Sequence, residues 1–181
     1  MDIYYATRDG HTRRIASHIG ARLSELGVDA RLRDLAAGLP AAAELAASSL
    51  VVVIAAVRYG RHLPDAERLL AVYRTLPAPP RLVLLSINLT ARKPGKDTAQ
   101  GNAYLRKLIA RYGLAPAFAA AIAGRLDYPL YGWFDRQMIR FIMLLTGGPT
   151  DPRAQVEYTA WPRVDDIAGR IALLHSTDLS P

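Results

Sequence analysis

The chain has 181 residues, of which 51% are hydrophobic and 22% are charged, and this size and composition suit one globular domain with its own core. It contains no cysteine, which excludes disulfides, thiolate metal sites and cysteine nucleophiles, and we expect no bound metal. The 23 Lys and Arg residues against 16 Asp and Glu give a formal charge of +7, which favours an acidic partner such as nucleic acid, an anionic membrane surface or an anionic small molecule.

The apolar segments of the chain are short. Met1 and Asp2 lead directly into apolar residues 3–6 without a basic segment, so we expect no signal peptide and a cytoplasmic protein. The longest uncharged apolar stretches, residues 48–57 and 112–124, are shorter than the roughly 18 to 20 residues that a spanning helix needs. Any membrane contact is therefore expected to be peripheral.

The first half of the chain alternates between strand and helix patterns. The predicted elements are, in order, a strand at 3–6, a helix from 12 onward, a strand at 28–35, a short helix at 40–47, a buried strand at 50–57, a helix at 64–76 and a strand at 81–89. Strands that alternate with helices are joined by right-handed crossovers. The sequence therefore predicts an α/β fold with a parallel sheet and helices on both faces.

The second half begins with a long insertion. Residues 90–98 are polar and basic and contain Pro94 and Gly95, which predicts a long loop after the fourth strand rather than a minimal connection. The further predicted elements are a helix ending near 112, a fifth strand at 118–123, a segment rich in Tyr and Arg at 125–131, an apolar helix at 131–145 and a last helix around 164–174. We expect a single domain over 1–181, with the insert at about 90–112.

The loop after the first predicted strand has the character of a phosphate site. Residues 7–12, Thr-Arg-Asp-Gly-His-Thr, lie between a strand and a helix, where free backbone N–H groups and the helix dipole converge. The single Gly10 differs from the three spaced glycines of a dinucleotide fingerprint and favours one phosphate over a pyrophosphate. The alternative is an ordinary turn with Thr12 as the N-cap.

Two further loops should lie beside this one. Arg58, Tyr59 and Gly60 follow the third strand, and residues 86–89 end the fourth, so in a doubly wound sheet both flank the crevice where ligands bind. Taken singly, Tyr59 is also compatible with a half-buried aromatic residue and Asn88 with a turn.

Taken together, these residues resemble the flavodoxin-like, quinone-dependent protoporphyrinogen oxidases of bacterial haem synthesis. The resemblance rests on ordered motifs from Thr7 to Trp161: Ala-Thr-Arg-Asp-Gly-His-Thr at 6–12, Arg-Tyr-Gly at 58–60, Ser-Ile-Asn-Leu-Thr-Ala-Arg-Lys-Pro at 86–94, Ala-Gly-Arg-Leu-Asp-Tyr-Pro at 123–129, Trp-Phe-Asp-Arg at 133–136, Met-Ile at 138–139, Gly-Gly at 147–148 and Thr-Asp at 150–151. It implies a flavodoxin-like five-stranded sheet in the order 2-1-3-4-5.

The resemblance also implies the cofactor and the reaction. FMN oxidises protoporphyrinogen IX to protoporphyrin IX, and the electrons pass to a respiratory quinone, typically menaquinone. The residues expected to bind FMN are Thr7, Arg8, Asp9, Gly10, His11, Thr12, Arg58, Tyr59, Gly60, Ser86, Asn88 and Leu89. Ala6 departs from the family, which usually has Ser there, and the loss of one hydroxyl weakens phosphate binding by about 1 kcal/mol. No catalytic residue is named, and His11 is expected to be a loop donor rather than a general base.

The insert and the apolar helix at 131–145 suggest two further contacts. Arg92, Lys93 and Lys96 are expected to pair with the propionates of the porphyrinogen, although a solvated surface loop is the alternative.

Within the helix, Phe134, Met138, Phe141 and Leu145 share one face, which is expected to be core. The opposite face mixes cations with large apolar groups, a composition that suits an anionic membrane surface or a tetrapyrrole edge; its expected membrane contacts are Trp133, Arg136, Arg140 and Leu144, with Met143 beside them. The alternative is that the C-terminal segment covers both sides of the helix.

Three other functions compete with this one. A flavodoxin-like NAD(P)H:quinone reductase would reduce its flavin rapidly with NAD(P)H, and a purely electron-carrying flavodoxin would be expected to be acidic rather than +7. A nucleic-acid-binding module agrees with the charge, but the arginines are scattered and no recognition motif is present, so no nucleic-acid partner is expected. The sequence leaves the oligomeric state open, a homo-oligomer included.

Overall fold

The computed structural model describes residues 1–130, 132–146 and 148–177, with the side chains of Asp135, Leu145 and Thr146 excepted. Its centre is a parallel sheet of β1 (Asp2–Ala6), β2 (Arg31–Asp34), β3 (Leu50–Arg58), β5 (Arg81–Ile87) and β6 (Phe118–Ile122), in the order β2-β1-β3-β5-β6. The short β4 (Arg61–His62) pairs antiparallel with the end of β3. With β4 set aside, this is the predicted order 2-1-3-4-5, and the flavodoxin-like fold is confirmed.

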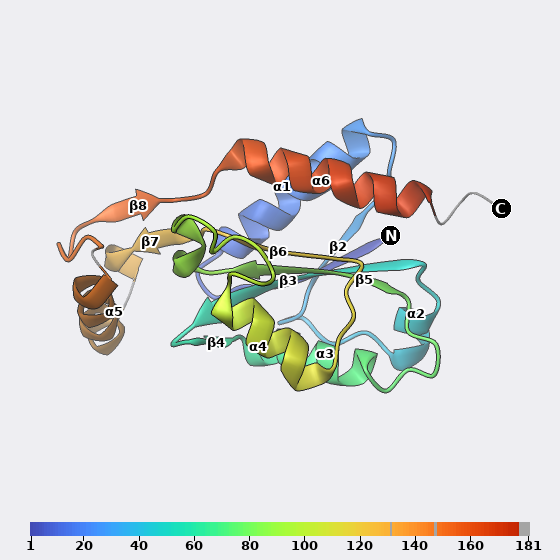
Figure 1. Cartoon of the computed structure of the whole chain (residues 1–181), viewed down its shortest axis with the longest axis horizontal. Coiled ribbons are helices and arrows are strands. Elements are labelled where there is room, and N and C mark those ends of the chain that lie inside the picture. Colours follow the sequence, from blue (N-terminus) through green and yellow to red (C-terminus); the bar gives the residue numbers. More distant parts are fainter. Residues whose placement is uncertain (131, 147, 178–181) are drawn as a thin grey trace.

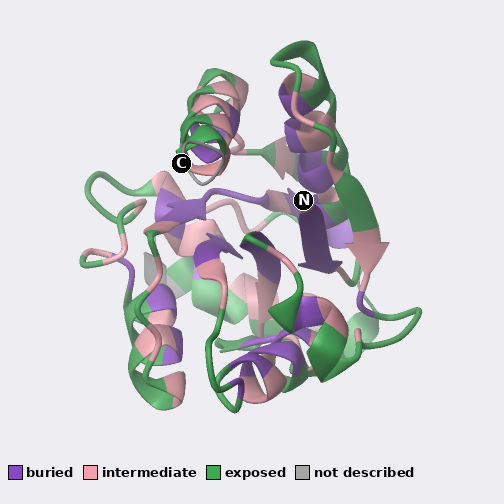
Figure 2. Cartoon of the chain, turned by 90° about the vertical axis from the view of Figure 1, so that its right-hand side faces the viewer, coloured by how far each residue is buried: buried purple, intermediate pink, exposed green. Residues whose placement is uncertain are grey.

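Helices cover both faces of this sheet (Figure 1). One face carries α1 (His11–Glu25) and α6 (Trp161–Ser176); the other carries α2 (Ala42–Ala46), α3 (Pro64–Tyr73) and α4 (Ala103–Tyr112). Successive strand residues point to opposite faces. Tyr4 and Val53 accordingly pack toward α3 and α4, while their neighbours Ile3 and Val52 pack toward α1 and α6. Both faces are buried, as the purple strands between the helices show (Figure 2).

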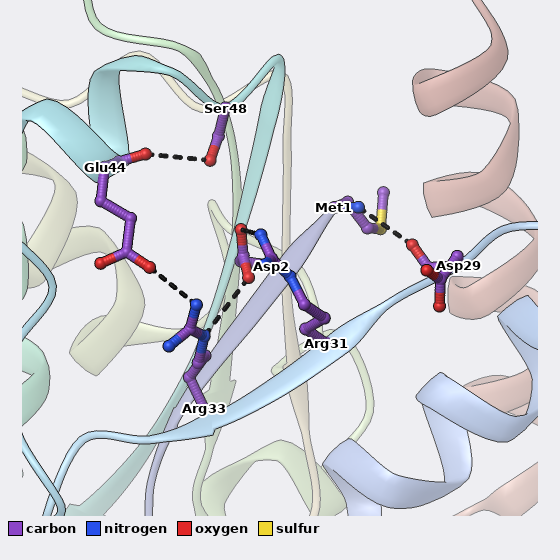
Figure 3. Close-up of polar contacts among 7 residues, drawn as sticks. All are labelled: Met1, Asp2, Asp29, Arg31, Arg33, Glu44 and Ser48. Carbon is purple, nitrogen blue, oxygen red and sulfur yellow. Dashed lines mark hydrogen bonds and ion pairs between the residues drawn. The ribbon is translucent and has the colours of Figure 1, made fainter.

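A cluster of charges holds the edge of the sheet at the amino ends of the strands (Figure 3). The buried carboxylate of Asp2 accepts hydrogen bonds from Arg31 at 3.1 Å and from Arg33 at 3.4 Å. Arg33 also donates to Glu44 of α2 at 2.7 Å. Because Arg31 and Arg33 belong to β2, these contacts fasten the edge strand to β1 and to α2. They lie at the end of the sheet opposite the site described below.

The remaining elements lie beyond the carboxyl ends of the strands (Figure 1). They are β7 (Arg125–Asp127), the 3₁₀ turn η2 (Tyr128–Leu130), α5 (Trp133–Thr146) and β8 (Gln155–Glu157), with β7 and β8 paired antiparallel. The chain thus leaves the core after β6, forms a ribbon and a helix, and returns at α6. The sequence predicted the helix but neither β4 nor the β7–β8 ribbon.

Candidate cofactor and substrate site

A pocket of about 540 Å³ opens at the carboxyl ends of β1, β3 and β5. The loops that follow these strands line it together. Of the residues predicted to bind a cofactor, those that line the pocket are Thr7, Arg8, Asp9, Gly10, His11, Thr12, Arg58, Tyr59, Gly60, Asn88 and Leu89. Ser86 is the exception, because its side chain is fully buried beneath the pocket.

The N-terminus of α1 points its backbone donors at one end of this pocket. The N-cap is Gly10, with φ of 80°, and neither a capping side chain nor an acidic residue in the first turn satisfies the helix. Thr12, the alternative N-cap in the sequence, instead lies inside the helix, so that interpretation is wrong. Thr12, in the first turn of α1, also lines the pocket. Free N–H groups and a helix dipole at one point fit a phosphate monoester.

His11 ties this loop to the C-terminal part of the chain. Its Nε2 lies 2.8 Å from the Thr159 hydroxyl, which in turn donates to the Ala123 carbonyl oxygen at 2.8 Å. Because the hydroxyl proton is already used, Nε2 of His11 must carry the proton of the first bond. Burial lowers the pKa of His11, against an opposing effect of Glu157. A neutral ring with this tautomer positions the loop and does not serve as a base through Nε2.

An ion pair and a strained turn form the neighbouring rim. Arg58 donates to both carboxylate oxygens of Asp9, at 2.8 and 3.1 Å, and so joins the loops after β1 and β3. Tyr59 and Gly60 connect β3 to β4 with φ values of 51° and 75°. A two-residue turn of this kind needs positive φ at both positions and usually contains Asn-Gly. A tyrosine there is held at an energetic cost, and this places its ring at the pocket edge, 5.2 Å from the Arg58 guanidinium.

A buried polar network supports the floor of the pocket. The Ser86 hydroxyl accepts from Asn88 at 2.9 Å and lies 2.8 Å from Nε2 of His62. Asn88 caps the 3₁₀ turn η1 (Leu89–Arg92), Asn102 caps α4, and Nδ2 of Asn102 donates to Oδ1 of Asn88 at 3.0 Å. The two amides therefore close the base of the insert. Burial lowers the pKa of His62 to about 4. Sequence reasoning missed His62 and Asn102, since neither belongs to a recognisable motif.

The cations of the insert are divided between pocket and solvent. Arg92 and Lys93 line the pocket, whereas Lys96 does not. Arg92 donates to the Leu89 carbonyl oxygen at 2.8 Å, and its guanidinium lies 5.3 Å from the centre of the Tyr158 ring. The contacts of Arg92 connect the insert to the segment before α6. Of Arg92 and Lys93, Lys93 is therefore more accessible to a ligand in the pocket.

A further part of the pocket lining comes from elements beyond the sheet. Arg125 and Asp127 of β7 form an ion pair at 2.6 Å and line the pocket. The apolar part of this lining consists of Leu130, Ile139, Ile142 and Met143, which we call the α5 wall. The sequence did not predict Leu130, Ile139 or Ile142 as lining residues, because the periodicity of α5 does not show which neighbour the helix meets, whereas Met143 was named on the face suited to a membrane surface or a tetrapyrrole edge.

The orientation of α5 corrects the prediction for its core face. Trp133, Phe134, Phe141 and Leu144 expose between 62 and 74% of their surface, and Met138 is also exposed. The expected core face of Phe134, Met138 and Phe141 is therefore wrong, and Met143, expected outside, is buried. Leu145 falls outside the described side chains. The reason is that both faces of the sheet are already covered, so α5 packs against the pocket mouth through Ile139 and Met143.

The predicted membrane contacts on α5 are unequally exposed. Trp133 and Leu144 point to solvent, whereas Arg136 and Arg140 are half-buried. Nε of Arg140 donates to the Thr150 carbonyl oxygen at 2.9 Å. Within the described ranges, no helix combines the length and hydropathy needed to traverse a bilayer.

Comparison with solved structures identifies the same fold. The rubredoxin oxygen:oxidoreductase of Desulfovibrio gigas superposes with a TM-score of 0.60 at 14% identity over 99% of this chain; the chain spans only 37% of that protein. The two-electron reduced flavodoxin of Megasphaera elsdenii gives a TM-score of 0.50 at 12% identity, over 66% of this chain and 83% of that one. These two comparisons show the flavodoxin-like fold.

Comparison of sequences is more specific. Residues 2–153 match the flavodoxin domain family. The protoporphyrinogen IX dehydrogenase [quinone] of Escherichia coli strain K12 is 39% identical over 97% of this chain and 95% of that protein. The Leishmania major protein of the same name is 35% identical over 94% of this chain and 73% of that protein. This chain therefore belongs to the flavodoxin-domain family of quinone-linked protoporphyrinogen IX dehydrogenases.

Proposed function

We propose that this chain oxidises protoporphyrinogen IX to protoporphyrin IX, with FMN as the cofactor and menaquinone as the electron acceptor. The observation that carries the proposal is one continuous pocket with a phosphate-binding helix end, an apolar wall and basic residues at its rim. The names of its relatives supply the substrate and the class of acceptor. When bound, the flavin supplies the two-electron redox chemistry.

The pocket favours FMN over a dinucleotide cofactor. Gly10 is the glycine at the helix start, and its N–H donates to the Thr7 hydroxyl at 3.1 Å, which tightens the loop around a single anion. A pyrophosphate would need the more open, glycine-rich turn of the dinucleotide folds. Tyr59 lines the pocket and offers an aromatic face to a flavin ring, whereas the side-chain amide of Asn88 is already used in the buried polar network.

The basic rim favours an anionic ring. Lys93 and Arg92 line the pocket on the insert side and Arg125 lines it on the β7 side. Cations near an apolar wall fit a macrocycle whose edge carries propionates. Lys96 is placed outside this pocket, so we now assign the accessible propionate contact to Lys93.

The test is anaerobic mixing of the FMN-loaded protein with protoporphyrinogen IX and a menaquinone analogue, followed by porphyrin fluorescence. We expect porphyrin to form in proportion to quinone consumed. Lys93→Ser should raise the KM for protoporphyrinogen several-fold, because it removes one charge-assisted hydrogen bond to a propionate. Lys96→Ser should leave this KM unchanged. Rapid flavin reduction by NAD(P)H, with no porphyrin formed, would instead identify a pyridine-nucleotide quinone reductase.

We also propose that the protein docks reversibly on the cytoplasmic face of an anionic membrane through α5. Trp133, Phe134, Phe141 and Leu144 form an exposed apolar surface beside the pocket mouth. Arg136 and Arg140 contribute attraction of about 1 kcal/mol each at most. Since both arginines are half-buried, apolar burial is expected to dominate.

Co-sedimentation with anionic phospholipid vesicles tests this docking. Trp133→Ser/Leu144→Ser should lower binding by at least about 100-fold at low and high salt, because burial of each side chain contributes roughly 1.5 kcal/mol or more. Arg136→Ser/Arg140→Ser should lower it only at low salt. Leu173→Ser on α6, where 69% of the residue is exposed, is the matched control. Equal binding by all variants, or none by the wild type, would contradict docking through α5.

A further inference from the structure

Arg14 is a cation in the first turn of α1 that lines the pocket. Its backbone N–H donates to the Gly10 carbonyl oxygen at 3.1 Å, so Arg14 lies one helical turn after the N-cap. Four residues of helix span about 6 Å, and helical side chains tilt back toward the N-terminus. The long Arg14 side chain can therefore reach an anion that binds at the start of α1.

Two contacts hold the guanidinium of Arg14. Its Nη1 donates to Glu157 of β8 at 2.8 Å, and the guanidinium lies 4.7 Å from the centre of the Trp161 ring. Nε1 of Trp161 donates to the same carboxylate at 2.6 Å. An arginine carries five N–H donors, and among the described residues Glu157 is the one acceptor bonded to Arg14. Further donors of Arg14 thus remain for a ligand, and a side chain that is already held loses little conformational freedom on binding.

Arg13 provides a contrast within the same helical turn. Its Nη2 donates to Asp34 of β2 at 3.0 Å, and Arg13 does not line the pocket. The side chain of Arg13 exposes 61% of its surface and that of Arg14 exposes 58%. The two arginines therefore differ in direction rather than in charge or burial, and only Arg14 faces the pocket.

We infer that Arg14 binds the phosphate of FMN and makes the pocket select the phosphorylated flavin over riboflavin. This inference rests on the proposed function, in which FMN is the cofactor. The backbone N–H groups at the start of α1 are neutral donors, whereas a guanidinium adds a full charge and paired donors that match phosphate oxygens. Because the Glu157 carboxylate competes with the phosphate for this charge, the strength of cofactor binding depends on β8 as well as on α1.

Titration of the apoprotein with FMN and with riboflavin, followed by quenching of flavin fluorescence, tests the inference. Arg14→Gln should weaken FMN binding about tenfold at low ionic strength, because one charge-assisted contact is lost, and should leave riboflavin binding unchanged. Arg13→Gln removes the same charge from the same turn but should weaken FMN binding by no more than about twofold, since solvent screens that charge. The loss in Arg14→Gln should shrink at high salt.

Two further variants separate the effect of charge from any effect on folding. Arg14→Lys keeps the charge without the paired donors and should recover part of the preference for FMN. Glu157→Gln keeps an acceptor for Arg14 and Trp161 but removes the competing charge, so it should tighten FMN binding several-fold without affecting riboflavin. Such a gain in affinity cannot result from misfolding.

The outcomes separate this inference from the proposed function. If Arg14→Gln and Arg13→Gln weaken FMN equally, if Arg14→Gln weakens riboflavin as much as FMN, or if Glu157→Gln brings no gain, the role of Arg14 is wrong while the proposed reaction stands. If the wild-type apoprotein binds neither flavin, the proposed function fails, and the inference fails with it.

Discussion

Gly10→Val is expected to raise the dissociation constant for FMN by about 100-fold. Gly10 has a φ of 80° at the start of α1, a conformation in which a β-branched residue costs on the order of 1 to 3 kcal/mol. The loop would relieve this strain by moving, and the backbone N–H groups at the helix start would lose their common direction. Titration of the apoprotein with FMN, followed by quenching of flavin fluorescence, measures the change.

The chain provides a matched control at Gly27. Its φ is 77°, and, as at Gly10, an added Cβ would meet nothing within 4 Å. Gly27→Val therefore introduces similar strain at the opposite end of α1, and it should lower the free energy of unfolding without changing FMN affinity. Unchanged FMN binding by Gly10→Val, or recovery of FAD from the purified protein, would refute the assignment of this loop to a monophosphate.

His62→Gln is expected to make the protein markedly more resistant to acid. Burial lowers the pKa of His62 from 6.5 to about 4, while Glu67 and Arg111 act in opposite directions. Between these values the unfolded chain binds the proton and the folded protein does not, so stability is complete above pH 6.5 and is lost as the pH falls toward 4. The loss is about 3 kcal/mol. Urea unfolding from pH 4 to pH 8 should show a shallower acid slope in the variant.

The variant Ser86→Ala tests whether burial or the contact with Ser86 lowers the pKa of His62. The Ser86 hydroxyl lies 2.8 Å from Nε2 of His62, so this variant removes the contact but leaves the imidazole buried. It should be less stable at every pH and keep the acid slope of the wild type. If His62→Gln kept that slope too, another group would have to titrate over this range.

The central sheet could be predicted from the sequence because its signals are local. Residues 50–57 and 81–89 are nearly continuous apolar runs, typical of strands buried on both faces, and the helix between them has one apolar face. The β7–β8 ribbon gives no such signal. Its strands are three residues long and pair Arg125 with Glu157, so the pairing depends on contacts between distant parts of the chain.

The incorrect core face on α5 has a similar origin. The spacing of Phe134, Met138 and Phe141 correctly indicates an apolar stripe on a helix, but a stripe does not specify what covers it. Met143 and Ile139 are the residues that pack inward, because α5 meets the pocket mouth rather than the sheet. Likewise, residues 7–12 were recognisable as a motif and do line the pocket, whereas His62 and Asn102 act through a buried network that unites separate segments.

The β7–β8 ribbon holds the two ends of the segment from Arg125 to Glu157 together, so this segment is a closed loop outside the central sheet. Its two ends are held together by the strand pairing and by the bond from the Tyr158 N–H to the Gly124 carbonyl oxygen at 3.1 Å. Once the ends are held together, lengthening the chain between them costs little entropy, about 0.6 kcal/mol for each doubling of length. Insertions, deletions and new side chains can therefore accumulate in this segment while α6 still returns to the same place on the sheet. The loops after β1, β3 and β5 and the α5 wall can in this way change at independent rates, and changes in the α5 wall need not disturb the folding of the core.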